Sequence, residues 1–225
     1  MARQMSKGKC NLCGGTFGKA AMTKHLKSCR QKESGSGQPS ASRSKHPAKA
    51  FHIVVQGRYA PDYWMHLEVP ADAKLEVLDD FLRGIWLECC GHLSAFTIEG
   101  TTFSVSPMAE YGDRSMRAKL GGVLNPGMTF YHEYDFGTTT HLTLKVVSQQ
   151  ESDAKATDIR VLARNEPPPI KCTSCEAPAT QVCTECLWSG EGWLCDACAA
   201  DHGCGEDMLL PVVNSPRVGM CGYTG

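Results

Sequence analysis

Cysteine pairs separated by two residues are the feature of this sequence with the clearest chemistry. The chain contains 13 Cys, most of them near its two ends. A CxxC pair turns the backbone tightly enough for both thiolates to reach one metal ion. The first thirty residues show no apolar stretch followed by a small-residue cleavage site, so we expect a cytoplasmic protein. In such a reducing compartment, paired cysteines usually bind metal and rarely form disulfides.

The first CxxC pair, Cys10 and Cys13, is followed by His25 and Cys29, which are four residues apart. Residues at that spacing lie on one face of a helix. The four side chains can therefore complete a tetrahedron around zinc. The segment resembles the ββα zinc-finger family, with a terminal Cys in place of the second His. The resemblance implies two short strands followed by a helix.

Three further CxxC pairs follow in the last sixty residues, together with His202, Cys204 and Cys221. They resemble the cross-braced B-box and MYND type of zinc module, in which alternate pairs share one ion. We expect Cys204 as the eighth ligand, with Cys221 as the alternative. Four protein ligands leave no open position on a zinc ion, so the three zinc ions predicted for the chain are structural. The two distal sites would comprise Cys172, Cys175, Cys195 and Cys198, and Cys183, Cys186, His202 and Cys204.

Two breaks in composition divide the chain into segments. The stretch 31–50 is rich in Ser, Gly, Pro and Lys and has almost nothing to bury, which predicts a flexible linker. A run of three prolines after Glu166 favours extended backbone and predicts a second boundary. The predicted organisation is a finger over 1–30, a central domain over 51–165, and a two-zinc module with a packed C-terminal tail over 166–225.

The central segment alternates between two hydrophobic periods. From residue 75 to 89, apolar positions recur at three and four, which predicts an amphipathic helix with Asp79 on its polar side. Elsewhere apolar and polar residues alternate, as in half-buried strands. The predicted fold class is α+β, with a mostly antiparallel sheet, one main helix, and small zinc-stabilised modules at both ends. Strands are expected at 51–55, 63–69, 95–99, 102–105, 128–136, 141–147 and 158–163.

Part of this segment resembles a known family. The sequence from Ile85 to Ile98, a Tyr-Gly step at Tyr111, and the stretch from Phe130 to Val146 with its YDFG motif are similar to the plasmid pRiA4b ORF-3-like domain. The match covers about residues 51–150. The resemblance implies an α+β fold and a loose association with mobile elements, and it transfers no catalytic residue.

Cys89, Cys90 and His92 lie close together at the end of the predicted helix. They could capture a metal ion or act as thiol and base. Cys also behaves as a small hydrophobe, and Cys89 continues the buried stripe that contains Trp86. We therefore assign these residues no role from the sequence alone.

Glu133 and Asp135 fall on one face of a predicted strand, and His132 falls on the apolar face. Paired carboxylates can do acid–base work. No nucleophile or metal-binding pattern accompanies them, so a solvated strand face is the simpler interpretation, with His132 and His141 as structural residues. The sequence has no glycine-rich phosphate loop, nucleophile elbow or HExxH motif. We expect no enzymatic activity and no small-molecule substrate.

Charge is segregated along the chain although the net charge is only -1. Residues 1–50 carry eleven Lys and Arg against one acid, whereas 51–165 has a net charge of -5 and 166–225 of -6. A basic end favours non-specific contact with the phosphates of DNA or RNA. The residues expected to make these contacts are Lys7, Lys9, Lys19, Lys24, Lys27 and Arg30.

Three functions remain open from the sequence. We favour a nucleic-acid-associated accessory or regulatory protein that does not catalyse a reaction. A zinc-stabilised adaptor that binds other proteins is the alternative, because many small zinc modules act in this way. An enzyme with its site in the central domain is the third. No apolar run approaches the roughly 20 residues of a membrane span, so no membrane partner is expected.

Overall fold

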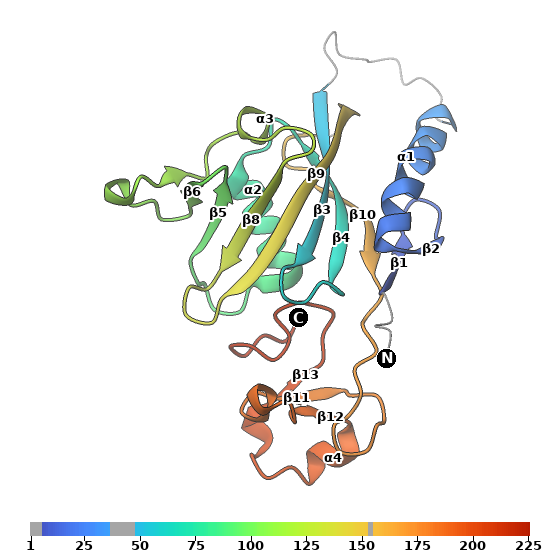
Figure 1. Cartoon of the computed structure of the whole chain (residues 1–225), viewed down its shortest axis with the longest axis vertical. Coiled ribbons are helices and arrows are strands. Elements are labelled where there is room, and N and C mark those ends of the chain that lie inside the picture. The colour runs from blue at the N-terminus through green and yellow to red at the C-terminus, as the bar shows by residue number, and fades with distance from the viewer. Residues whose placement is uncertain (1–5, 37–47, 153–154) are drawn as a thin grey trace.

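The computed structural model describes residues 6–36, 48–152 and 155–225. Of the predicted linker, 31–50, residues 37–47 lie outside the described residues, whereas 31–36 are helical and 48–50 form part of a strand. A ten-stranded sheet and a three-stranded sheet give the predicted α+β fold. Figure 1 shows the large sheet with helices on its two faces and the smaller, cysteine-rich unit below it. No helix in the described part of the chain is long and apolar enough to cross a membrane.

The large sheet contains every strand that the hydrophobic pattern predicts between residues 51 and 163. Its strands are β1 (Lys7–Cys10), β2 (Thr16–Gly18), β3 (Ala48–Gly57), β4 (Trp64–Pro70), β5 (Ser94–Ile98), β6 (Thr101–Ser104), β7 (Arg114–Ser115), β8 (Thr129–Tyr134), β9 (Thr140–Ser152) and β10 (Arg160–Asn165). Their spatial order is β2-β1-β10-β4-β3-β9-β8-β5-β6-β7. All neighbours pair antiparallel except β6 and β7. The prediction of a mostly antiparallel sheet is confirmed.

One face of this sheet is covered by α2 (Leu75–Leu82), which continues as a π-helical turn, η1 (Arg83–Leu87). In this turn the N–H of Glu88 bonds to the carbonyl of Arg83, five residues back, at 2.8 Å. The regular helix is thus shorter than the predicted 75–89. Its apolar stripe is buried in the main core all the same, against the odd-numbered residues of β3 and β4. Two short elements complete this part of the chain, η2 (Ala109–Tyr111) and α3 (Leu120–Val123).

Asp79 is buried, so its predicted place on the polar side of the helix is wrong. Only 2% of the residue is exposed. Its Oδ1 lies 2.7 Å from His132 Nε2, and its Oδ2 accepts a hydrogen bond from Ser94 Oγ at 2.9 Å. A carboxylate can be buried when it is hydrogen-bonded. Helical periodicity could not reveal these partners, because they lie on β8 and β5.

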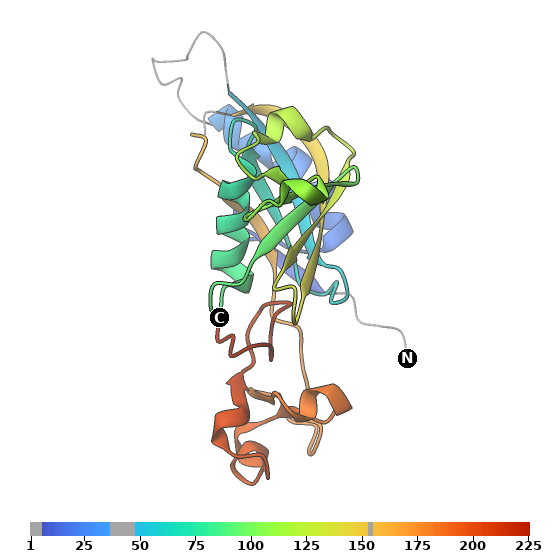
Figure 2. The same ribbon diagram turned by 90° about the vertical axis from the view of Figure 1, so that its left-hand side faces the viewer.

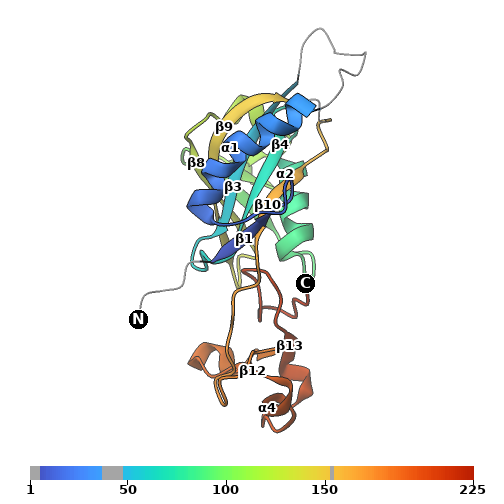
Figure 3. The ribbon, with the colours of Figure 1, turned by 90° about the vertical axis from the view of Figure 1, so that its right-hand side faces the viewer.

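The opposite face is covered by α1 (Lys19–Ser36), which belongs to the N-terminal finger. Figure 3 shows α1 in front of β3 and β4, whereas Figure 2 shows α2 on the other side of the sheet. Strand β1 pairs with β10, from Gly8 opposite Asn165 to Cys10 opposite Ala163. Met22 and Leu26 of α1 pack with Trp64 in a second buried cluster. The strands of the finger therefore belong to the same sheet as the central domain, and the helix of the finger covers one face of that sheet.

Close approach at this junction explains a glycine in β1. A Cβ atom at Gly8 would overlap the backbone carbonyl of Arg164 and would lie 2.5 Å from the Trp64 ring. Real Cβ atoms essentially never come so near. Gly8 is thus required by the contact between the finger and the sheet, since only glycine lets the two backbones approach so closely.

A histidine pair is buried between α1 and the sheet. His52 Nε2 of β3 lies 2.9 Å from His66 Nδ1 of β4. Burial, with added repulsion from Arg30 and Lys27, lowers the pKa of His52 to about 4. Burial, with repulsion from His52 and Lys19, lowers the pKa of His66 to about 3. Both imidazoles are neutral at physiological pH, since a charge here would lack solvent.

The C-terminal unit contains a small sheet in the order β12-β11-β13. Its elements are β11 (Gln181–Cys183), η3 (Cys186–Ser189), β12 (Trp193–Leu194), α4 (Asp196–Ala200), η4 (Glu206–Met208) and β13 (Leu209–Pro211). After β13 the tail returns to the central domain, where Ser215, Arg217 and Val218 are buried. Ser215 Oγ donates to the carbonyl of Trp86 at 2.6 Å, which ties this tail to η1.

Gly8→Ala is expected to destabilise the zinc-loaded protein by about 1–3 kcal/mol, because overpacking forces strand β1 away from β10. Gly18→Ala is the matched control, since the nearest atom to its Cβ is 4.0 Å away. Denaturant unfolding at constant zinc concentration measures both variants. Equal stability of the two variants would contradict the tight contact at Gly8.

The histidine pair predicts that stability falls with acid from about pH 6.5. The folded-state pKa values of His52 and His66 lie below the ordinary value of 6.5, so only the unfolded chain takes up these protons as pH falls. Each histidine should remove about 2 kcal/mol of unfolding free energy between pH 7 and pH 5. His52→Gln with His66→Gln should flatten this dependence. Acid releases metal from the wild type and from the double variant alike, so the test compares the two proteins. If the difference between their unfolding free energies were the same at pH 7 and pH 5, the result would count against the buried pair.

Candidate metal centres

The finger brings its four predicted ligands together. Cys10 ends β1, Cys13 follows in the turn, and His25 and Cys29 project from α1. Their donor atoms all lie within 4.8 Å of one another. The turn is closed by a hydrogen bond from the N–H of Gly14 to the carbonyl of Cys10 at 2.8 Å. Three thiols and one imidazole form a donor set that suits zinc.

Aromatic packing holds the histidine of the finger in place. The rings of Phe17 and His25 are stacked with centroids 4.2 Å apart. His25 Nε2 lies 3.3 Å from Cys13 Sγ. Burial and the neighbouring thiols of Cys13 and Cys10 raise the pKa of Cys29 to about 11. Metal binding must therefore displace thiol protons, which couples metal affinity to pH.

The distal cysteines form two groups in which alternate pairs share a site. Cys172 and Cys175 gather with Cys195 and Cys198, which lie beside β12 and in α4. In each group the donor atoms lie within 4.8 Å of one another. This is the crossed arrangement expected from the resemblance to B-box and MYND modules. The second group consists of Cys183, Cys186, His202 and Cys204.

Cys204, and not Cys221, lies beside the other three ligands of that second group. Cys204 Sγ is 3.6 Å from Cys186 Sγ, and Cys186 Sγ is 3.5 Å from His202 Nε2. The short spacing between His202 and Cys204 is accommodated because α4 has ended before His202 and the chain turns there. Cys221 lies instead against the central domain, beside Cys90 and His92.

Backbone amides prepare one thiolate in each distal group. Burial opposes ionisation of Cys172, but N–H groups of Cys195, Ser174 and Cys175 outweigh it and lower the pKa of this thiol to about 6. Burial likewise opposes ionisation of Cys183, whose pKa nevertheless falls to about 7. The N–H of Cys186 and the side chain of His202 cause that decrease. Such amide–sulfur hydrogen bonds favour the form of the thiol that binds metal.

All four Cys/His groups in the described residues are consistent with structural zinc sites. The fourth group joins Cys89, Cys90 and His92 to Cys221, a set that spacing along the sequence does not predict. A count could have signalled it. Ten of the 13 Cys belong to the three predicted sites. The remaining three, Cys89, Cys90 and Cys221, are the cysteines of the fourth group.

The six cationic residues expected at a nucleic-acid surface do not share one environment. Lys7, Lys9, Lys24 and Lys27 are exposed. Lys19 is half-buried, and its ammonium donates to Gln56 of β3. Arg30 is buried, and its guanidinium forms an ion pair with Glu68 of β4, so it is not available at the surface of this structure. Docking of α1 on the sheet brings Glu68 to Arg30, a contact that a finger on a free arm would not make.

The candidate carboxylates of β8 are held in separate ion pairs. Glu133 Oε1 lies 3.0 Å from His141 Nδ1. Asp135 is buried, contrary to the expected solvated strand face, and its Oδ2 lies 2.7 Å from Arg217 of the tail. Its position just after β8, with a φ of 66, turns it toward this tail. The two carboxylates thus have different partners and do not form a paired acid–base site.

Comparison with known proteins leaves the function to be argued from geometry. No family model and no curated protein matches the chain. Among solved structures, it is similar to a protein of unknown function, MM3350, from Methanosarcina mazei Go1. The sequence identity is 15%, the TM-score is 0.46, and the match covers 53% of this chain and 70% of that one. The resemblance to the pRiA4b ORF-3-like domain therefore stays a prediction.

The crossed arrangement predicts which double substitutions release one zinc ion and which release two. Cys175→Ser with Cys198→Ser removes two ligands of the same site, so the zinc content should fall by one ion. Cys175→Ser with Cys186→Ser removes one ligand from each site, so it should fall by two. Native mass spectrometry counts the ions. Sequential pairing along the chain would reverse the two results.

Proposed function

We propose that this chain is a non-catalytic, zinc-stabilised accessory protein that holds single-stranded nucleic acid on the open part of its large sheet. Helix α1 covers β3 and β4 (Figure 3), whereas no described helix covers the same face over β9, β8 and β5 (Figure 1). Side chains that favour bases and phosphates lie on this uncovered part. The observation that carries the proposal is an arginine held between two exposed tyrosines.

These three residues form an aromatic platform, Arg58, Tyr59 and Tyr131. The Arg58 guanidinium lies 4.9 Å from the ring centroid of Tyr131 and 5.7 Å from that of Tyr59. Tyr59 is 76% exposed and Tyr131 is 36% exposed. Exposed aromatic rings stack nucleic-acid bases without strong sequence preference, and arginine adds cation–π attraction. Such a platform needs unpaired bases, so single strands suit it better than duplexes.

Cations lie beside the platform, on the α1 side of Tyr131 in the strand order. Lys145 is exposed on β9, and Lys24 and Lys27 are exposed on α1, which borders the open area. Glu133 lies on the same face, but His141 is 3.0 Å from its carboxylate. Phosphates of a bound strand would meet this positive charge between Tyr131 and helix α1. This arrangement predicts non-specific, salt-sensitive binding.

Tyr131→Ala is expected to weaken binding of a labelled oligothymidylate by about 5- to 150-fold, because loss of one stacking contact costs about 1–3 kcal/mol. Fluorescence polarisation with zinc-loaded protein at about 50 and 200 mM salt measures this change. Tyr111→Ala is the matched control, since Tyr111 is 73% exposed at the far end of the sheet. Lys24→Ala with Lys27→Ala should make the affinity less dependent on salt.

Failure to bind at low salt would overturn the proposal, provided that the protein is folded and zinc-loaded. Equal losses from Tyr131→Ala and Tyr111→Ala would also overturn it, because the platform would then have no special role. Preference for duplex over single-stranded DNA would argue against stacking and would leave only phosphate contact by the lysines.

A protein adaptor is the second candidate, and one residue favours it. Trp188 of η3 is 70% exposed, within a C-terminal segment of net charge -6. An exposed tryptophan in an acidic setting is typical of a surface that binds a basic, partly apolar peptide. If Tyr131→Ala bound such a peptide as well as the wild type did, and Trp188→Ala bound it more weakly, the result would support this candidate.

A further inference from the structure

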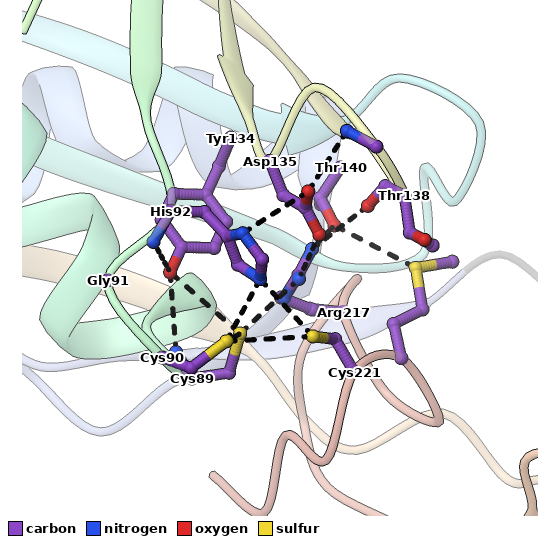
Figure 4. Close-up of polar contacts among 12 residues, drawn as sticks. Cys89, Cys90, Gly91, His92, Tyr134, Asp135, Thr138, Thr140, Arg217 and Cys221 are labelled. Atoms are coloured by element: carbon purple, nitrogen blue, oxygen red, sulfur yellow. Dashed lines mark hydrogen bonds and ion pairs between the residues drawn. The ribbon is translucent and has the colours of Figure 1, made fainter.

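The fourth Cys/His group lies where the C-terminal tail meets the central domain. Cys89 and Cys90 follow η1, His92 precedes β5, and Cys221 comes from the tail, 129 residues beyond His92. Figure 4 shows the three sulfur atoms and the imidazole turned toward one another. Their donor atoms all lie within 4.8 Å. Two segments that are distant in sequence, the loop 89–92 and the tail, therefore converge on one point.

The spacing of the donors fits a four-coordinate zinc ion. Cys90 Sγ lies 3.6 Å from Cys89 Sγ and 3.7 Å from Cys221 Sγ. Zn–S bonds of about 2.3 Å in a tetrahedron place two sulfurs about 3.8 Å apart. His92 Nε2 lies 3.0 Å from Cys90 Sγ and 3.2 Å from Cys221 Sγ, slightly less than the about 3.5 Å of a mixed N–S edge. A disulfide would need sulfurs about 2.05 Å apart.

The orientation of His92 is a separate observation that points to a metal. While Nε2 faces the thiols, Nδ1 lies 3.4 Å from Asp135 Oδ1. Histidines that bind metal usually donate the N–H of their other ring nitrogen to a carboxylate or carbonyl, which sets the tautomer. Asp135 is only 5% exposed and cannot swing away, because Arg217 and the N–H of Gly137 hold it.

Arg217 supplies the charge that such a site requires. Its guanidinium is fully buried and donates to Cys89 Sγ at 3.3 Å and to Asp135 Oδ2 at 2.7 Å. It also donates to the carbonyl of Thr138 and the hydroxyl of Thr140. Three thiolates around Zn²⁺ leave one negative charge, and the guanidinium that Cys89 shares with Asp135 lies close enough to stabilise it. The tail thus brings both a ligand, Cys221, and a cation.

We propose that Cys89, Cys90, His92 and Cys221 bind a fourth zinc ion that fastens the C-terminal tail to the central domain. Binding releases the three thiol protons to solvent and forms three Zn–S bonds and one Zn–N bond. All four positions are taken by protein, so the ion is structural. The proposal does not depend on nucleic-acid binding, because it rests on a different surface.

The full-length protein, purified with zinc under reducing conditions, tests the site. Native mass spectrometry is expected to count four zinc ions in the wild type and three in His92→Gln. His141→Gln is the matched control and should keep four, because His141 belongs to none of the four groups. Cys90→Ser with Cys221→Ser should also retain three, since both ligands serve one ion.

Hydrogen exchange supplies a readout of the fastening itself. The tail, 212–225, should exchange faster in Cys221→Ser than in the wild type, whereas β3 and β9 should be unaffected. Cobalt loading should give the visible absorption of tetrahedral thiolate coordination. The absorbance of Cys221→Ser should be lower than that of the wild type by the contribution of one site.

Three zinc ions in folded wild type, with Cys90 and Cys221 open to alkylation, would overturn the proposal. So would a disulfide among Cys89, Cys90 and Cys221 in the reduced preparation. Four ions in both His92→Gln and Cys221→Ser would overturn it as well, because the fourth ion would then lie elsewhere.

Discussion

The burial of β4 on both faces is the constraint on which the rest of the structure depends. All seven residues of this strand are buried. Its odd-numbered side chains face α2, and Trp64, His66 and Glu68 face the finger helix α1. Without α1, this indole, imidazole and carboxylate would lie on an open sheet face and would lack the helix that packs against them. A metal ion bound by the finger would therefore stabilise the central domain too, because it would organise the helix that covers β4.

Strand β10 is the link that makes this cover possible. It pairs with β4 on one side and with β1 of the finger on the other. The chain then leaves β10 for the cysteine-rich unit and returns through its tail to η1 and β8. Both ends of the chain thus close onto the same domain. Two cross-braced groups organise the distal unit, and the proposed fourth site would fasten its return.

The finger is docked on the central domain, unlike a zinc finger that moves freely on a flexible arm. Its docking places Arg30 against Glu68 and Lys19 against Gln56, so two of the predicted phosphate contacts serve the fold. The same docking leaves Lys24 and Lys27 beside the open part of the sheet. Burial of one half of the face and exposure of the other half are two consequences of one contact. The proposed platform around Tyr131 lies on the exposed half.

Local pattern was sufficient for most of the secondary structure and for most ligands of the three metal sets whose members lie close in sequence. Strand alternation predicts every strand of the central domain except the two-residue β7, and CxxC spacing predicts the finger ligands, because these signals depend only on neighbouring residues. The alternating pairing of the distal groups was predicted from the resemblance to B-box and MYND modules. That resemblance also rests on residues that lie near one another in sequence. The choice between Cys204 and Cys221 could not be made in this way.

Only the tertiary structure decided the contacts between distant segments. Asp79 is buried by His132 and Ser94, Arg30 is neutralised by Glu68, and Cys221 meets His92 across 129 residues. Each of these partners comes from another element, and periodicity carries no information about which elements become neighbours. What the sequence by itself determined is where strands, helices and close metal ligands lie. Which faces are covered, which charges are paired and where the tail is fastened depend on packing, because burial is a property of the assembled sheet.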